Sequence, residues 1–175
     1  MSDRLVAPWS QSKYLTGTSL LFLGPSLYAY RLEQPLISLL LTITSLVSAN
    51  FWRKANYTIR RNCDLVMAKV TMAILCYNAA KHITYIRAGL MCYPVLMMLT
   101  YTYYKSHELF NQGNDKWLIY HIITHAAMTY EQYAIVYIID ESPIHGTNTQ
   151  RDTTLIMCLM IIYFRGLHEI KKRIR

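Results

Sequence analysis

Residues 34–52 read QPLISLLLTITSLVSANFW and contain no charged side chain. The segment begins directly after Glu33 and ends directly before Arg53, so charged residues mark both of its ends. A bilayer has a hydrocarbon core about 30 Å thick, which a helix of about 20 apolar residues can cross. The segment therefore has the length and the composition of a membrane-spanning helix.

Other apolar stretches surround this segment. Residues 14–30 and 88–104 also lack charged side chains, and each of three weaker stretches contains an ionisable group. Such groups are costly in lipid unless they face the protein interior or water. We predict an all-α fold, a polytopic transmembrane bundle of about six helices. One integral membrane domain covers residues 1–175, with approximate spans at 14–31, 34–52, 62–80, 86–104, 117–139 and 151–167.

The composition agrees with a membrane protein and argues against a nucleic-acid-binding one. Charged residues make up 16% of the chain, against about 25% in typical soluble domains. The mean hydropathy of +0.15 is modest because it is lowered by 15 tyrosines, which are common at bilayer interfaces. The net charge of +8 comes from basic clusters between apolar runs, not from a basic stripe on a soluble scaffold. We expect the lipid bilayer, and not nucleic acid, as the partner.

Lys and Arg are distributed unevenly between the two sets of loops that six spans would create. Cytoplasmic loops of membrane proteins carry an excess of these residues. The more basic set includes both ends of the chain, so we predict that both termini are cytoplasmic. That set contains Arg4, Lys13, Arg53, Lys54, Arg60, Arg61, Lys105, Lys116, Lys171, Lys172, Arg173 and Arg175, and the other contains Arg31, Lys81, Arg87 and Arg151.

Several common chemistries have no motif in this chain. The sequence contains no P-loop, GxSxG, HExxH or dinucleotide fingerprint, each of which has a characteristic spacing. Its cysteines form no CxxC pair, so neither a zinc ribbon nor a thioredoxin-type site is indicated. We expect the thiols to be buried as small apolar groups. They are Cys63, Cys76, Cys92 and Cys158.

Polar residues in three of the predicted spans point to one membrane face. Residues four apart on a helix lie about 40° apart around its axis, so His121 and His125 present both imidazoles from one stripe. This spacing is typical of metal ligands. Asp64, near the start of the third span, and Ser48, near the end of the second, are expected on the same side of the membrane.

At these positions the sequence resembles the CREST superfamily of membrane proteins, which includes alkaline ceramidases, progestin and adipoQ receptors and myomaker-like proteins. Its members share Ser-x3-His at the end of an early helix, Asp at the start of the next, and His-x3-His in a late one. Here the matching residues are Ser48-Ala-Asn-Phe-Trp52, Asn62-Cys63-Asp64 and Tyr120-His121-Ile-Ile-Thr-His125. The resemblance implies a zinc ion with His121 and His125 as ligands. It also implies catalytic roles for Ser48 and Asp64 in cleaving a lipid amide or ester.

The sequence departs from the CREST pattern in two ways. Trp52 stands where the third histidine belongs, and an indole cannot ligate zinc. Only four predicted spans precede His-x3-His, against six in the family, so the bundle would be a shortened form of the seven-helix core. Because both numbers are even, the helix that carries His-x3-His crosses the membrane in the same direction here as in the family.

Three functions follow from these observations. The first is a zinc-dependent membrane hydrolase acting on a lipid substrate, and the second is a non-catalytic subunit or scaffold within a larger membrane assembly. The third is a small ion or proton pathway through Asp64, His121, His125 and Glu131. Structural roles are equally available, because the histidines can hydrogen-bond to neighbouring helices and Ser48 can serve close packing. Asp64 can be a counter-ion for Lys69 or Arg61, and Glu131 lies about 80° off the histidine stripe.

Overall fold

The structure, a computed structural model, describes residues 5–82 and 88–141. Within these ranges it is all-helical and contains no strand, which confirms the all-α part of the predicted fold. The elements are α1 (Trp9–Ser19), the 3₁₀ turn η1 (Leu20–Phe22), α2 (Leu23–Arg31), α3 (Pro35–Trp52), α4 (Ile59–Ala80), the π-helical turn η2 (Ala88–Cys92), α6 (Tyr93–Asn111) and α7 (Trp117–Glu141).

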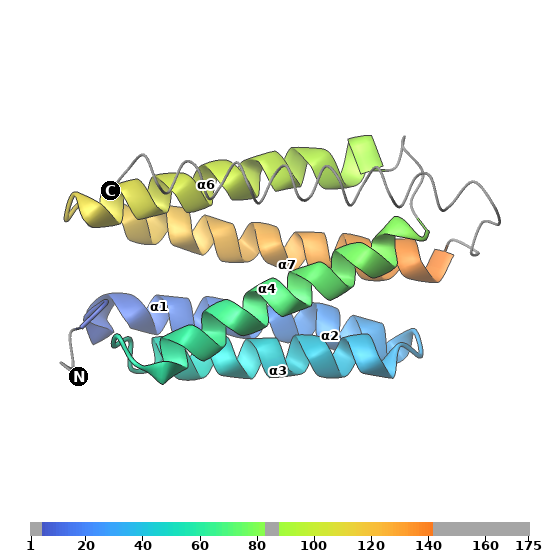
Figure 1. Ribbon diagram of the computed structural model, residues 1–175, viewed down its shortest axis with the longest axis horizontal. Helices are drawn as coiled ribbons and strands as arrows, with labels where there is room; N and C mark the ends of the chain where they lie inside the picture. Colours follow the sequence, from blue (N-terminus) through green and yellow to red (C-terminus); the bar gives the residue numbers. More distant parts are fainter. Residues whose placement is uncertain (1–4, 83–87, 142–175) are drawn as a thin grey trace.

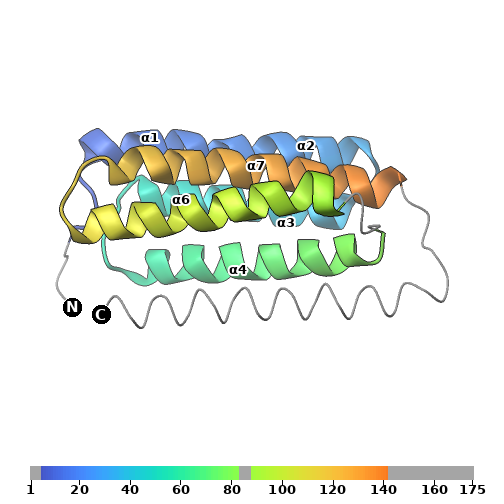
Figure 2. The same ribbon diagram turned by 90° about the horizontal axis from the view of Figure 1, so that it is seen from above.

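The helices run lengthwise through the molecule, with α4 inclined to the others in Figure 1, and the chain reverses direction from α2 to α3, from α3 to α4 and from α6 to α7 (Figures 1 and 2). Helix α7 packs against α1, α2, α4 and α6 and so contacts most of the bundle. At one end of the molecule α1, α4 and α7 begin and α3 and α6 end (Figure 1). We call this the basic end, because it holds Arg53, Lys54, Arg60, Arg61 and Lys116.

Within residues 5–82 and 88–141, two helices have the length and composition needed to cross a membrane. These are α3, with 18 residues, and α4, with 22 residues. At 1.5 Å per residue they measure about 27 and 33 Å, close to the thickness of the hydrocarbon core. Pro35 occupies the first turn of α3, where its missing N–H costs no hydrogen bond. Helix α4 begins three residues before the predicted span, so its first turn includes Arg60 and Arg61.

The first predicted span, 14–31, is interrupted in the structure. It begins earlier, at Trp9, and divides into α1, η1 and α2. The physical reason is Pro25, which has no N–H to donate to the carbonyl of Leu21 and whose ring crowds that carbonyl. The helix therefore tightens into the 3₁₀ turn just before the proline and then continues as α2.

The structure describes the later predicted spans only in part. Elements η2 and α6 cover residues 88–111 and α7 covers 117–141, while the predicted span 151–167 lies outside the described residues. A turn at 111–114 separates α6 from α7. Gly113 has φ +68°, and the N–H of Asn114 donates to the carbonyl of Leu109 at 2.9 Å. This is the left-handed glycine cap with which many helices end.

Side-chain hydroxyl groups, which we call the hydroxyl seam, join the interrupted helix α1–η1–α2 to α3. Ser45 Oγ donates to the carbonyl of Ser19 at 2.9 Å, and the hydroxyls of Ser19 and Ser48 lie 3.0 Å apart. Further along, Ser26 Oγ donates to the carbonyl of Ser38 at 2.8 Å. Small polar residues of this kind let two helix backbones approach closely.

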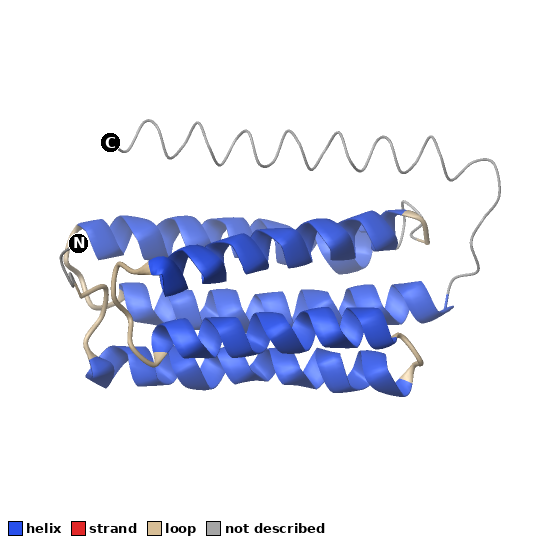
Figure 3. Cartoon of the chain, turned by 60° about the horizontal axis from the view of Figure 1, so that its bottom comes forward, coloured by secondary structure: helices blue, strands red, loops and turns tan. Residues whose placement is uncertain are grey.

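Buried apolar side chains form one cluster towards each end of the bundle. The cluster at the basic end contains Leu15, Phe51, Trp52, Leu109 and Trp117. The cluster towards the other end contains Leu41, Leu75, Ile135 and Val136 among others. The described loops lie at the two ends of the bundle, so the long middle portion is purely helical (Figure 3).

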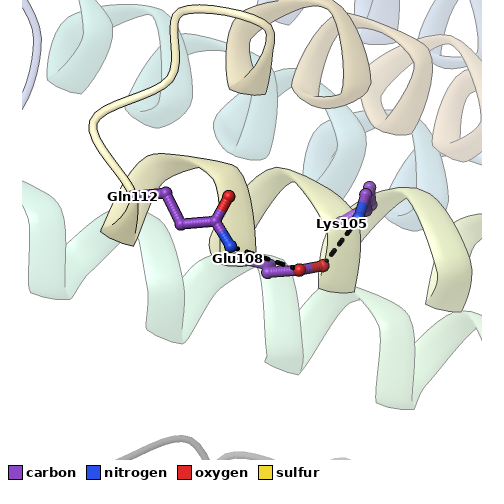
Figure 4. A network of polar contacts seen from close by, with 3 residues as sticks. All are labelled: Lys105, Glu108 and Gln112. Carbon is purple, nitrogen blue, oxygen red and sulfur yellow. Dashed lines mark hydrogen bonds and ion pairs between the residues drawn. The ribbon is translucent and has the colours of Figure 1, made fainter.

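One ion pair is present among the described residues. Lys105 Nζ lies 2.9 Å from Glu108 Oε2, and Gln112 Nε2 donates to the other carboxylate oxygen at 3.4 Å (Figure 4). The hydrogen bond to Glu108 raises the pKa of the Lys105 ammonium. The network lies in the last turns of α6, close to the basic end, where charged side chains reach water.

Candidate functional site

Trp52 of α3 meets the two predicted metal ligands of α7, His121 and His125, inside the basic end. Trp52 closes α3, and His121 and His125 lie in the first turns of α7. The ring centroid of Trp52 is 5.0 Å from that of His121 and 6.5 Å from that of His125. The two imidazole centroids are themselves 5.0 Å apart. We call Trp52, Trp117, His121 and His125 the histidine cluster.

A serine of α6 orients the imidazole of His121. Ser106 Oγ donates its proton to the carbonyl of Trp117 at 3.1 Å and lies 3.3 Å from His121 Nδ1. When the hydroxyl proton is directed to that carbonyl, Nδ1 of His121 is the donor to Ser106. The neutral imidazole therefore carries its lone pair on Nε2.

The same arrangement recurs at His125, with a threonine of α1. Thr18 Oγ1 donates to the carbonyl of Leu15 at 3.2 Å and lies 2.9 Å from His125 Nδ1. With the Thr18 proton on that carbonyl, His125 likewise carries its proton on Nδ1 and its lone pair on Nε2. Metal-binding histidines are typically held in this way, with the second nitrogen donating to a fixed acceptor.

Trp52 fills the position between the two helices that a third histidine would take. Its indole is only 5% exposed and packs against Phe51, with ring centroids 4.6 Å apart, and against Trp117 at 6.4 Å. The indole Nε1 is buried without a hydrogen-bond partner among the described residues. The side chain therefore contributes apolar packing and one unpaired donor, but no metal ligand.

Asp64 and Ser48 form a second polar group. The carboxyl group of Asp64, on α4, interacts with the side chain of Ser48, whose hydroxyl is 3.0 Å from that of Ser19. No ion pair joins Asp64 to Lys69 or Arg61 within the described chain, so the structure does not show the counter-ion role considered from the sequence. Ser48 and Asp64 are brought together as the resemblance implies.

The described residues do not complete the three-histidine zinc site that the resemblance implies. No group of three His, Cys, Asp or Glu side chains within residues 5–82 and 88–141 could hold a metal ion. The histidine cluster offers two imidazoles, whereas catalytic zinc sites use three protein ligands. An unpaired indole N–H occupies the remaining side of the cluster.

Glu131 and the cysteines lie away from the histidine cluster. Glu131 interacts with Cys92 of η2 and lines a small cavity with Gln132, which the sequence did not single out. Cys63 is exposed, contrary to expectation, because it lies on the outer surface of α4, while Cys76 and Cys92 are half-buried. Cys158 lies outside the described residues.

Sequence reasoning also missed the two hydroxyl residues that orient the histidines, Thr18 and Ser106. No local signal distinguishes them, because Ser and Thr are frequent in the apolar helices of this chain. Their role depends on how the helices rotate against one another.

Comparison with known proteins adds no relative: no family model, no curated protein and no solved structure matches this chain.

Proposed function

We propose that this chain is a multi-pass integral membrane protein. The core helix of a water-soluble protein is mostly buried, whereas 39% of the apolar window of α3 and 22% of that of α4 are buried here. Large apolar side chains point outwards along the helices, including Leu27, Leu36 and Met97 with exposed fractions of 63%, 81% and 72%. Monomeric soluble proteins rarely expose so much apolar surface. Lipid that covers these helices removes the free-energy cost of exposing their apolar side chains to water.

Within this membrane protein, the histidine cluster serves as a packing element of a CREST-like scaffold that does not hydrolyse lipid. The observation that carries this proposal is the position of Trp52, whose buried ring lies against both imidazoles. A hydrolytic zinc needs a third ligand to bind firmly and to activate water. The resulting function is that of a membrane-embedded subunit or scaffold, with both termini on the cytoplasmic side.

Zinc analysis of the detergent-purified protein tests this proposal. We expect no stoichiometric zinc in the wild type. Trp52→His should bind zinc, because it supplies a third imidazole beside two that already direct their Nε2 lone pairs away from Ser106 and Thr18. Trp52→Phe is the matched control and should not bind zinc. Equimolar zinc in the wild type that is lost in His121→Ala would contradict the proposal.

The hydrolase is the second candidate, and two observations favour it. Each histidine has a hydroxyl group within hydrogen-bonding distance of its Nδ1, which leaves Nε2 for a ligand, and Asp64 interacts with Ser48. In that case the bound metal would supply an activated water, and Asp64 and Ser48 would orient it. Lipid amide and ester hydrolysis by the purified wild type, with matched losses in Asp64→Asn and His125→Ala, would establish this function. An inactive wild type contradicts it.

A scaffold role also predicts partners. Chemical crosslinking in native membranes, followed by purification, should recover one or more membrane proteins in fixed ratio with this chain. The same partners should be recovered with the folded variant His121→Gln, because the proposed role does not need the histidine lone pairs. A chain that purifies alone from crosslinked membranes would argue against a subunit role.

A further inference from the structure

A second polar site lies halfway along the bundle, away from the histidine cluster. Helices α3, α4 and α7 enclose a cavity of about 10 Å³ there. Four polar side chains line it, and the rest of its wall is apolar. The polar residues are Thr44 of α3, Thr71 of α4, and Glu131 and Gln132 of α7.

Two of these side chains have unpaired oxygen atoms. Glu131 Oε2 and Gln132 Oε1 are buried without a hydrogen-bond partner among the described residues. Their residues are 5% and 4% exposed. A buried acceptor without a partner costs about 1–3 kcal/mol, and more when it carries charge. Two such atoms on the wall of one cavity therefore call for a ligand that satisfies both.

The two threonines present acceptors to the cavity as well. Thr44 Oγ1 donates its proton to the carbonyl of Leu40 at 2.8 Å. The hydroxyls of Thr44 and Thr71 are 2.6 Å apart, and since the proton of Thr44 is used, Thr71 is the donor in that contact. Each hydroxyl oxygen retains a lone pair beyond these contacts.

The lining thus combines one carboxylate with neutral oxygen acceptors and contains no cationic side chain. A water molecule could bond to two of the acceptors, but it would leave the carboxylate charge uncompensated in a low-dielectric interior, which is expensive. A divalent ion fits poorly. Calcium takes six to eight ligands, and magnesium keeps several waters, whereas a cavity of this size holds about one water-sized species.

We propose that this cavity binds one sodium ion through Glu131, Gln132, Thr44 and Thr71. The ion supplies the single positive charge that the carboxylate lacks and accepts coordination from each of the unpaired oxygens. Cys92 of η2 interacts with Glu131 from outside the cavity, and Cys76 of α4 lies close to the same carboxylate. The ion would therefore link α3 and α4 to α7 halfway along the bundle. This inference does not depend on zinc binding.

Thermal unfolding of the purified protein in detergent tests the site. The melting temperature is measured in sodium chloride and in choline chloride at equal ionic strength and pH. Binding to the native state alone should raise the Tm by roughly 3–6 °C at a sodium concentration about ten times Kd. The sodium-dependent shift should disappear in Glu131→Gln, which keeps the shape but removes the charge. It should persist in Glu108→Gln, which removes a half-buried carboxylate near the basic end, outside the cavity.

Isothermal titration of the wild type with sodium chloride keeps the proposal testable if Glu131→Gln does not fold. A saturable one-site isotherm is expected, and Thr71→Val should weaken it. The absence of saturable binding would overturn the proposal. Equal Tm values in sodium and choline, combined with stability that follows pH alone, would show that Glu131 carries a proton instead and would also overturn it.

Discussion

The indole of Trp52 lies edge-on to the imidazole of His121, with ring centroids 5.0 Å apart and planes inclined at 68°. An edge-to-face pair of this kind is favourable when both rings are neutral. The Nδ1 proton of His121 is already committed to Ser106. The contact therefore joins α3 to α7 through packing, at the position where the CREST pattern would place a metal ligand.

Substitution of Trp52 should separate the packing contribution of the ring from its hydrogen-bonding group. Trp52→Ala should destabilise the protein by about 3–5 kcal/mol, because it leaves a large cavity at the basic end. Trp52→Phe should cost much less, since it removes a buried N–H that has no partner. Thermal unfolding in detergent measures both. Equal losses in the two variants would mean that the indole N–H has a partner not seen among the described residues.

Two helical glycines should respond to alanine in opposite ways. A Cβ at Gly24 would collide with the hydroxyl of Tyr133, whereas a Cβ at Gly17 would meet no atom within 4 Å. Gly17→Ala should stabilise the protein by about 0.5–1 kcal/mol through helix propensity. Gly24→Ala should destabilise it, and Tyr133→Phe should relieve part of the loss. The measurement is the unfolding midpoint of Gly17→Ala, Gly24→Ala, Tyr133→Phe and the double variant Gly24→Ala/Tyr133→Phe. A stabilising Gly24→Ala would refute the packing of α2 against α7.

Replacing Glu33 with glycine should stabilise the protein. It has φ +57°, a left-handed conformation that costs a non-glycine residue about 1–2 kcal/mol. Glu33→Gly removes that cost at the turn between α2 and α3, although glycine also raises the entropy of the unfolded chain. A net gain of roughly 0.5–1 kcal/mol is expected in the unfolding free energy. Gly113→Ala, at φ +68°, is the inverse control and should lose stability.

The orientation in the membrane can be tested with two engineered cysteines. Arg31 ends α2, shortly before the start of α3, and Lys54 follows the end of α3; both are exposed, and Arg31→Cys and Lys54→Cys each remove one positive charge. In a background without native cysteines, a membrane-impermeant maleimide should label Arg31→Cys on intact cells. It should label Lys54→Cys only after permeabilisation. The reverse pattern would invert the predicted topology.

The parts of the fold that depend on composition were predictable. The segment 34–52 is bounded by charges and contains none, and its helix follows within one residue as α3. The turn at Gly113 follows from the left-handed conformation that glycine alone adopts without strain. The break in the first span was not predicted, although Pro25 is visible in the sequence, because prolines in apolar helices are often accommodated without a change of helix type.

The candidate site was predictable only as a set of residues. Spacing placed His121 and His125 on one stripe, and the order of the spans placed Ser48, Asp64 and the histidines towards the same end. Which hydroxyl bonds to which imidazole depends on the rotation of α1 and α6 about their axes, which composition does not determine. The same holds for Gln132, whose oxygen shares a cavity with that of Glu131 only because α3 and α4 close over α7.

The hydroxyl seam between Ser19, Ser26 and α3 has a consequence for biosynthesis. Its hydrogen bonds involve only residues up to Ser48, so the N-terminal hairpin can satisfy them while the ribosome is still producing the rest of the chain. A nascent chain stalled shortly after Thr58 should therefore already be integrated as a protease-protected pair; degradation of that intermediate would disprove this order of events. The newly inserted hairpin would then act as the template on which α7, arriving last among the described helices, completes the assembly.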